Sequence, residues 1–168
     1  MSLLLTGCGS GKAADLPDGT LLVASRRAAP LGLAGRTVDG GSADLATWRG
    51  QVVVLNVWGS WCHPCQQEAP DLAAISRDLA PQGVRFLGLD ERDTPGAAVA
   101  FQQRYGVGYP SISDDDGGLV ARIRQLPVAA VPTTLLLDRQ GRPAARLLGR
   151  VHPSQLLPLV RALLAEPA

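Results

Sequence analysis

The sequence predicts one α/β domain, with a central β-sheet that contains parallel strand pairs and carries helices on both faces. Apolar runs rich in valine and leucine, at residues 52–57 and 84–89, are typical of strands buried on both faces. Each run is followed by a segment with helical features, at residues 62–79 and 95–105. Strands that alternate with helices favour parallel pairing, with the helices packed against the sheet.

Length, composition and charge fit this fold class and exclude several kinds of protein. The chain has 168 residues, of which 46% are hydrophobic, and this suits one globular domain. Its net charge of +1 gives no broad attraction to nucleic acid, so we expect no nucleic-acid partner. We also expect the protein to be a monomer. No apolar stretch reaches the roughly 20 residues that a membrane-spanning helix needs.

The N-terminal region predicts a lipid anchor. The segment Leu5–Cys8 resembles the bacterial lipobox, whose cysteine is lipidated, and a Gly-Ser-Gly stretch follows it. We therefore expect a residual signal segment at residues 1–8, lipidation of Cys8, a tether and connector at residues 9–30, and the folded domain at residues 31–168. The alternative is an unmodified exposed cysteine, because no basic region precedes Cys8. An anchor would place the domain on the outer face of the cytoplasmic membrane, where disulfides persist.

The remaining elements follow from local patterns. The glycine pair Gly40-Gly41 indicates an N-terminal hairpin, Thr94-Pro95 starts a helix, and Pro70 predicts a kink within another. The full order is a short strand at 20–23, a strand at 31–39, a helical turn at 44–48, a strand at 52–57, a helix at 62–79, a strand at 84–89, a helix at 95–105, a strand at 110–113, a short helix at 119–125, strands at 133–137 and 143–148, and a helix at 154–164. The last two strands are expected as an antiparallel hairpin at the edge of the sheet.

The motif Trp61–Cys65 has the sequence Trp-Cys-His-Pro-Cys and lies where the first central strand meets a helix. A thiol at the start of a helix faces unpaired backbone N–H groups and the positive end of the helix dipole, which favour the reactive thiolate. Cys65 lies one turn beyond Cys62 on the same face, where the two thiols can form a disulfide. We expect this redox-active disulfide to be the reactive group, with no other cofactor.

A zinc half-site is the alternative use of a cysteine pair. Structural zinc usually needs four ligands arranged as two Cys/His pairs. Beyond the pair itself, the sequence offers only Cys8 and two histidines, one of them inside the motif. We therefore expect no metal site.

A family resemblance rests on these residues. The stretch Asn56–Pro70 is similar to the active-site segment of TlpA/ResA-type thiol-disulfide oxidoreductases, which are thioredoxin-fold proteins on the outer face of bacterial membranes. The resemblance extends over residues 31–164, and its further motifs are Leu45-x-x-Trp48-Arg49-Gly50, Val131-Pro132-Thr133-Thr134 and Asp138-x-x-Gly141. It implies a thioredoxin-like fold with an N-terminal hairpin extension.

The resemblance also implies roles for the residues that react. Cys62 would be the attacking thiol and Cys65 the resolving thiol of a disulfide between the two. Pro132 would be a cis-proline facing them, although most X-Pro bonds are trans. A cis bond would let Val131 present its backbone to an extended client segment.

Glu68 would join Cys62, Cys65 and Pro132 as a catalytic residue, and the residues that would tune the site are Asn56, Trp61, His63, Pro64 and Val131. Asn56 stands where cytoplasmic thioredoxins carry a buried aspartate. Glu68 matches a glutamate of the family and is either a proton acceptor for the resolving thiol or a solvated helix carboxylate. His63 departs from the family; a protonated His63 would favour the thiolate, and the alternative is a tolerated spacer. Pro64 and Trp61 complete the motif, and one of the two nearby tryptophans is expected to shield the disulfide.

These observations predict an extracytoplasmic, membrane-tethered thiol-disulfide oxidoreductase that reduces client proteins with cysteine pairs. By resemblance, the client would be apocytochrome c during cytochrome c maturation, and a membrane partner would resupply electrons. The first alternative is a disulfide donor for secreted proteins. The second is a Sco-like metallochaperone, which would need Cys-x-x-x-Cys and a distal histidine, for which His152 is the candidate.

Overall fold

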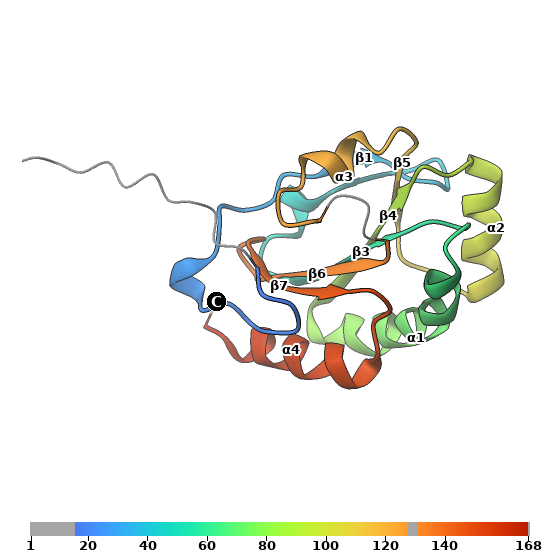
Figure 1. Cartoon of the computed structure of the whole chain (residues 1–168). Helices are drawn as coiled ribbons and strands as arrows, with labels where there is room; N and C mark the ends of the chain where they lie inside the picture. The colour runs from blue at the N-terminus through green and yellow to red at the C-terminus, as the bar shows by residue number, and fades with distance from the viewer. Residues whose placement is uncertain (1–15, 128–130, 168) are drawn as a thin grey trace, which may run out of the picture.

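A five-stranded sheet forms the centre of the protein, with strand order β5-β4-β3-β6-β7 (Figure 1). The computed structural model describes residues 16–127 and 131–167. Its elements are η1 (Ala24–Arg26), β1 (Ala34–Arg36), β2 (Ser42–Asp44), η2 (Leu45–Trp48), β3 (Val52–Trp58), α1 (His63–Leu79), η3 (Ala80–Gln82), β4 (Val84–Glu91), α2 (Pro95–Tyr105), β5 (Ser111–Asp114), α3 (Gly118–Arg122), β6 (Thr133–Leu137), β7 (Pro143–Leu148) and α4 (Pro153–Ala165). The predicted mixed α/β sheet with helices on both faces and an N-terminal β1–β2 hairpin is confirmed.

The central strand β3 is buried along its whole length, as its valine-rich sequence predicts. It pairs in parallel with β4 and antiparallel with β6. β6 therefore lies inside the sheet and only β7 lies at that edge, whereas the sequence predicted both strands of the closing hairpin at the edge. The register places Asn56 opposite Thr134 and Trp58 opposite Asp90, which brings polar side chains from three strands to one end of the sheet.

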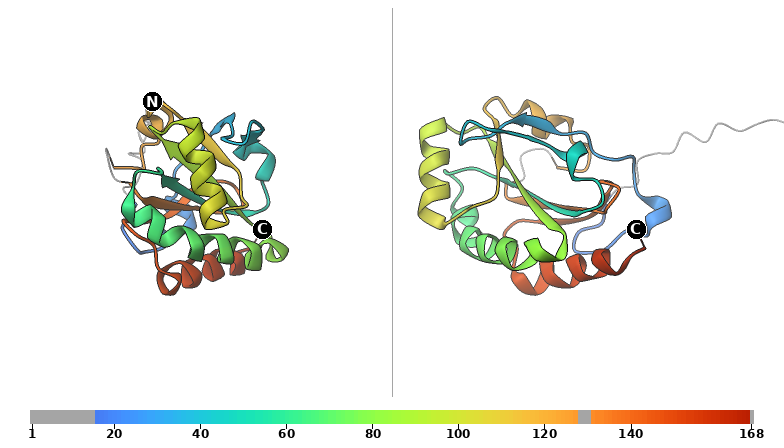
Figure 2. Two further views of the ribbon diagram at one scale, coloured as in Figure 1. Left: turned by 90° about the vertical axis from the view of Figure 1, so that its right-hand side faces the viewer. Right: turned by 180° about the vertical axis from the view of Figure 1, so that it is seen from behind.

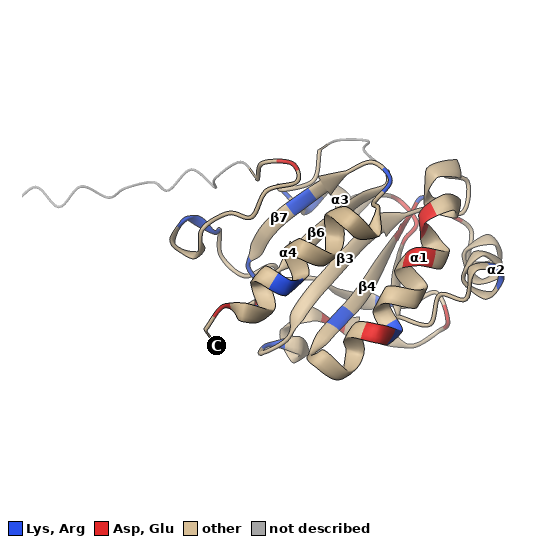
Figure 3. Ribbon diagram, turned by 90° about the horizontal axis from the view of Figure 1, so that it is seen from below, with Lys and Arg blue, Asp and Glu red and all other residues tan. Residues whose placement is uncertain are grey.

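Two apolar layers enclose the sheet. Val52 and Val54 face the side that α1 and α4 cover, and Val53 and Leu55 face the side of the β1–β2 hairpin and α3. Figures 1 and 2 show α1 and α4 together on one face and α2 beside α1 at the end of the sheet. Acidic and basic residues are mixed over the helical face, as the small net charge predicts (Figure 3).

The segment at residues 16–30 packs against the domain, in contrast to the expected tether and connector. Instead of a separate short strand, it runs along β7: Gly19 N donates to Arg146 O at 2.8 Å, and Leu22 N donates to Ala144 O at 2.8 Å. The segment thereby covers the open edge of the sheet, whose unpaired backbone groups would otherwise remain available for intermolecular pairing.

Arg27 fastens this segment to the far end of the chain. Its buried guanidinium donates to Asp138 at 3.0 Å and to Glu166 at 2.6 Å. Burial alone would raise the pKa of Asp138, but hydrogen bonds from Arg142 and Arg27 outweigh burial and hold that pKa below its ordinary value. The lipidation predicted at Cys8 lies outside the described residues.

Candidate active site

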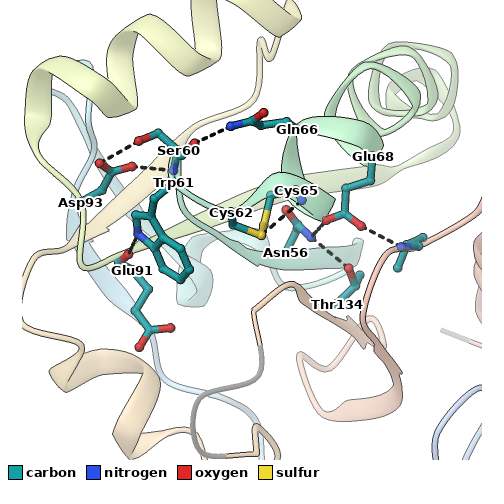
Figure 4. Close-up of a disulfide and its surroundings, with 11 residues drawn as sticks. Asn56, Ser60, Trp61, Cys62, Cys65, Gln66, Glu68, Glu91, Asp93 and Thr134 are labelled. Carbon is teal, nitrogen blue, oxygen red and sulfur yellow. Dashed lines mark hydrogen bonds between the residues drawn. A yellow bond between two sulfur atoms is a disulfide. The ribbon is translucent and has the colours of Figure 1, made fainter.

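The two motif cysteines form a disulfide at the junction of β3 and α1 (Figure 4). Their Cα atoms are 5.2 Å apart, and Cys62 caps the N-terminus of α1, where its Sγ accepts a hydrogen bond from Cys65 N at 3.2 Å. Little of the disulfide is accessible to solvent: Cys62 is 4% exposed and Cys65 is 1% exposed. Once reduced, Cys62 would present its sulfur to the unpaired N–H groups of the first helical turn, which favour a thiolate.

Glu68 is buried one helical turn beyond Cys65, with only 1% of its surface exposed. Its carboxylate accepts hydrogen bonds from Asn56 Nδ2 at 2.9 Å and from Val151 N at 2.7 Å. Burial raises the pKa of Glu68 to about 7, although these two hydrogen bonds oppose the shift. The solvated-carboxylate alternative for Glu68 is therefore wrong.

Asn56 links this carboxyl to the sheet. Besides its bond to Glu68, its amide donates to Thr134 Oγ1 at 3.1 Å on the neighbouring strand β6 (Figure 4). Both donors of the buried amide are thus occupied, which orients the amide nitrogen toward Glu68 and Thr134.

The two tryptophans near the motif divide between the core and the surface. Trp58 is buried, stacks on Phe101 with ring centroids 4.4 Å apart, and donates to Ser111 Oγ at 3.3 Å. Trp61 is 57% exposed, and its Nε1 donates to the backbone oxygen of Glu91 at 3.2 Å. Trp61 therefore forms part of the surface beside the disulfide.

The loop before Cys62 is held by residues that sequence reasoning missed. Asp93 accepts hydrogen bonds from Ser60 N at 2.6 Å and from Ser60 Oγ at 2.9 Å, and Gln66 Nε2 donates to Ser60 O at 2.9 Å (Figure 4). The sequence signal that could have found them is the acidic run at residues 90–93, directly after the predicted strand at 84–89. Neighbouring parallel strands end at the same edge of a sheet, so this run is expected near the motif that follows the strand at 52–57.

The peptide bond between Val131 and Pro132 is cis, as the resemblance implies. Val131 packs against the apolar cluster that contains both motif cysteines, and Pro132 O accepts a hydrogen bond from Gly149 N at 3.0 Å. Val131 and the cis bond that follows it thus lie next to the disulfide. Their role in client binding stays a proposal.

Within the described residues, neither histidine forms a hydrogen bond to the sulfur of Cys62 or Cys65. His63 is exposed, and its Nε2 lies 3.2 Å from Gln67 Nε2. His152 caps the N-terminus of α4, and its backbone N donates to Gln155 Oε1 at 3.1 Å. Within residues 16–127 and 131–167, no group of three or more His, Cys, Asp or Glu side chains is arranged to hold a metal ion.

Comparisons with known proteins agree with this geometry. Residues 25–144 match the AhpC/TSA family. The chain is 37% identical to the thiol:disulfide interchange protein DsbE of Pseudomonas aeruginosa, over 73% of this chain and 67% of that protein. It is 30% identical to the thiol-disulfide oxidoreductase ResA of Bacillus thuringiensis, over 71% of this chain and 67% of that protein.

Solved structures give the same result. A secreted thiol-disulfide isomerase from Corynebacterium glutamicum superposes with a TM-score of 0.82 at 33% identity, covering 88% of this chain and 92% of that one. A DsbF homologue from Corynebacterium diphtheriae superposes with a TM-score of 0.80 at 33% identity, covering 85% and 91%. In the part of the chain that the structure describes, no helix is both long and apolar enough to cross a membrane.

The disulfide at the start of α1, the thioredoxin-like sheet and these similarities lead to one conclusion. The chain belongs to the AhpC/TSA family and is a thiol-disulfide oxidoreductase of the ResA and DsbE type.

Proposed function

We propose that this protein reduces disulfides in client proteins outside the cytoplasm. The thiolate of reduced Cys62 attacks one client sulfur and displaces the other as a thiolate, which leaves a mixed disulfide. Cys65 then loses its proton and attacks Cys62 Sγ, which expels the second client sulfur and forms the Cys62–Cys65 disulfide. Two electrons pass from the protein to the client, and the displaced client thiolates take up protons.

The observation that carries this proposal is the buried carboxyl of Glu68, one turn from the resolving thiol. A base works best when its pKa lies near the working pH, and burial gives Glu68 a pKa of about 7. Glu68 therefore suits the task of accepting the proton that Cys65 must lose. Asn56 and Val151 hold its two oxygens in place.

The same carboxyl supports reduction as the direction of electron flow. An ionised Glu68 disfavours a second negative charge nearby, so it destabilises the thiolate forms of the two cysteines. Strong protein oxidants have the opposite property, since their reduced form is stabilised. A site with a buried acid beside the sulfurs thus has the character of a reductant.

Clients would bind in extended form over Trp61 and the described residues Val131 and Pro132. The backbone of Val131, next to the cis bond, can pair with an added strand, and such pairing requires no particular client side chain. Within this class, apocytochrome c with its haem-binding cysteine pair is the proposed client, and a membrane electron-transfer partner would return the electrons.

The location of the protein belongs to the same proposal. The relative from Corynebacterium glutamicum is a secreted protein, which supports an extracytoplasmic site of action. Lipidation of Cys8 would attach the chain to the outer face of the membrane. Metabolic labelling with a fatty-acid probe tests this: wild-type protein should take up label, and Cys8→Ser should not.

The deciding experiment measures the midpoint potential of the Cys62–Cys65 couple in defined thiol buffers. A value near that of thioredoxin, about −270 mV, is expected, whereas a value near about −120 mV would make the protein a disulfide donor. In parallel, Cys65→Ala should trap a mixed disulfide between Cys62 and a client. An oxidised Cys-x-x-Cys-His peptide from apocytochrome c serves as the test client, and the same peptide with serines in place of cysteines serves as its control.

A further inference from the structure

A pair of acidic residues lies on the other side of the loop that precedes the disulfide. Asp90, near the end of β4, is 1% exposed, and its carboxyl lies near the carboxyl of Asp93 in the turn before α2. Two carboxyl groups that approach each other can share a hydrogen bond only when one of them carries a proton. The question is which of the two retains it.

The side chain of Asp93 is surrounded by hydrogen-bond donors. It accepts three hydrogen bonds, from Ser60 N at 2.6 Å, from Ser60 Oγ at 2.9 Å and from Thr94 N at 2.8 Å. It also directly precedes Thr94, the residue that caps α2, where the positive end of the helix dipole stabilises an anion. These donors make Asp93 the acceptor of the pair and assign the shared proton to Asp90.

The surroundings of Asp90 favour its neutral form. Among the described residues, no donor hydrogen-bonds to its buried Oδ1 atom. Burial, together with the negative charges of Asp93, Asp115 and Asp114, raises the pKa of Asp90 to about 8. The nearby cation, Arg92, is exposed and turns instead toward a Glu91 oxygen at 3.8 Å.

The other elements around Asp90 contribute no opposing charge. On β3 the residue paired with it is the uncharged Trp58. Trp58 lies in an apolar cluster with Ala98 and Phe101 of α2 and with both cysteines. On β5 the paired residue is Ser113, followed by the acidic Asp114.

We propose that Asp90 and Asp93 share one proton and that this pair positions the attacking cysteine, by fixing Ser60 and hence the loop that delivers Cys62 to the start of α1. Both are positioning residues and neither touches the reacting sulfurs in this role. When Asp90 loses the proton, two buried carboxylates face each other, the bond between them is lost, and Asp93 holds Ser60 less firmly. The inference rests on thiol-disulfide exchange itself, so it does not depend on the direction of electron flow or on the client.

The test is the rate at which iodoacetamide alkylates Cys62 in the reduced protein, measured from pH 5 to pH 10 by mass spectrometry of the Cys62 peptide. In the wild type, the rate rises as the thiol ionises and then, near pH 8, falls below the curve of a single titrating thiol. Asp90→Asn, which stays neutral, should remove this second inflection. Asp93→Asn should lower the rate at pH 7 by about tenfold, because misplacing a reacting group costs up to about a hundredfold.

Asp78→Asn is the matched control, since Asp78 is an exposed residue near the end of α1. It makes the same change of charge and should alter neither the rate nor the shape of the profile. The proposal is overturned if the wild type shows one inflection only, if Asp90→Asn keeps the second one, or if Asp93→Asn reacts like Asp78→Asn.

A direct measurement covers the case in which Asp93→Asn does not fold. Carbon-13 NMR of aspartate-labelled wild-type protein should contain one carboxyl that titrates near pH 8 and that disappears in Asp90→Asn. An Asp90 carboxyl that titrates in the ordinary range for aspartate refutes the shared proton. The midpoint potential decides the proposed function independently, so the two can fail separately.

Discussion

The acidic residues at the two ends of the sheet have opposite environments. At the end away from the disulfide, Asp138 binds the guanidinium groups of Arg27 and Arg142 at 3.0 and 2.8 Å, and its pKa is lowered. At the disulfide end, Glu68 and Asp90 are equally buried but form no ion pair with an arginine or lysine among the described residues, and their pKa values are raised to about 7 and about 8, although the charge of Arg150 opposes the shift of Glu68. Arg27 and Arg142 thus stabilise the carboxylate of Asp138, whereas burial favours the protonated forms of Glu68 and Asp90.

Removing Asp138, the acid that is paired with arginines, should produce the largest effect on stability. Asp138→Ala leaves the buried guanidinium of Arg27 without one of its partners, and breaking a buried ion pair in this way costs about 3–5 kcal/mol. Urea unfolding of the oxidised protein measures this loss, while the midpoint potential should stay unchanged. Asp78→Ala on the surface of α1 is the control; an Asp138→Ala protein as stable as that control would contradict the interpretation.

Removing the carboxyl of Glu68 should affect the rate of thiol-disulfide exchange instead of stability. Glu68→Gln keeps the shape of the side chain but cannot take a proton from Cys65, so release of the client from the mixed disulfide should slow by about a hundredfold. Stopped-flow kinetics with a preformed mixed disulfide measure this step. The inflection near pH 7 in its rate profile should vanish in Glu68→Gln and persist in Asp71→Asn, also on α1. A profile that Glu68→Gln leaves unaltered would remove Glu68 from the mechanism.

The pH dependence of stability sharpens the same contrast. Glu68 and Asp90 keep their protons in the folded protein up to about pH 7 and 8, whereas the unfolded chain releases them near its ordinary values of 4.5 and 3.8. The folded state therefore binds more protons between these limits, and the free energy of unfolding should fall as pH rises, by about 1.4 kcal/mol per pH unit for each retained proton.

Asp138 has the opposite sign, because its lowered pKa gives stability that is present above the unfolded pKa and is lost as the pH falls. Urea unfolding at pH 4.5, 6, 7 and 8 checks the combined prediction. The decline should flatten in the double variant Glu68→Gln, Asp90→Asn. A wild-type stability that rises steadily from pH 4.5 to 8 would be incompatible with protonated acids at the disulfide end.

The smallest effect is expected where a side chain only orients one of these acids. Thr134→Val removes the oxygen that accepts from Asn56 at 3.1 Å, and the loss of one such hydrogen bond costs about 1 kcal/mol. Thr134→Ser keeps the hydroxyl and should behave like the wild type. Urea unfolding and the Glu68 titration give the readout; equal values for the Val and Ser variants would mean that this bond does not matter.

Local patterns were sufficient to predict much of the fold. Strand β3 is a continuous apolar run, and α2 begins where Thr94 and Pro95 predict and spans the expected residues 95–105. The cysteine pair could be placed at a strand-to-helix junction for the same reason, since its neighbours in sequence are also its neighbours in space.

What sequence reasoning missed depends on contacts between distant segments. Ser60 and Asp93 are 33 residues apart, and Arg27 and Asp138 are 111 residues apart, so neither pair forms a local pattern. The burial of Glu68 likewise depends on the loop that carries Val151, because the helix alone does not tell which of its faces that loop covers.

Trp61 lies where its intrinsic fluorescence can report the redox state of the disulfide. Trp61 directly precedes Cys62, its indole is fixed by the bond to Glu91 O, and the residue is 57% exposed (Figure 4). A neighbouring disulfide quenches the emission of an excited indole, and reduction removes that quencher. The tryptophan fluorescence of the protein should therefore rise when the disulfide is reduced, and Trp61→Phe should abolish most of this change.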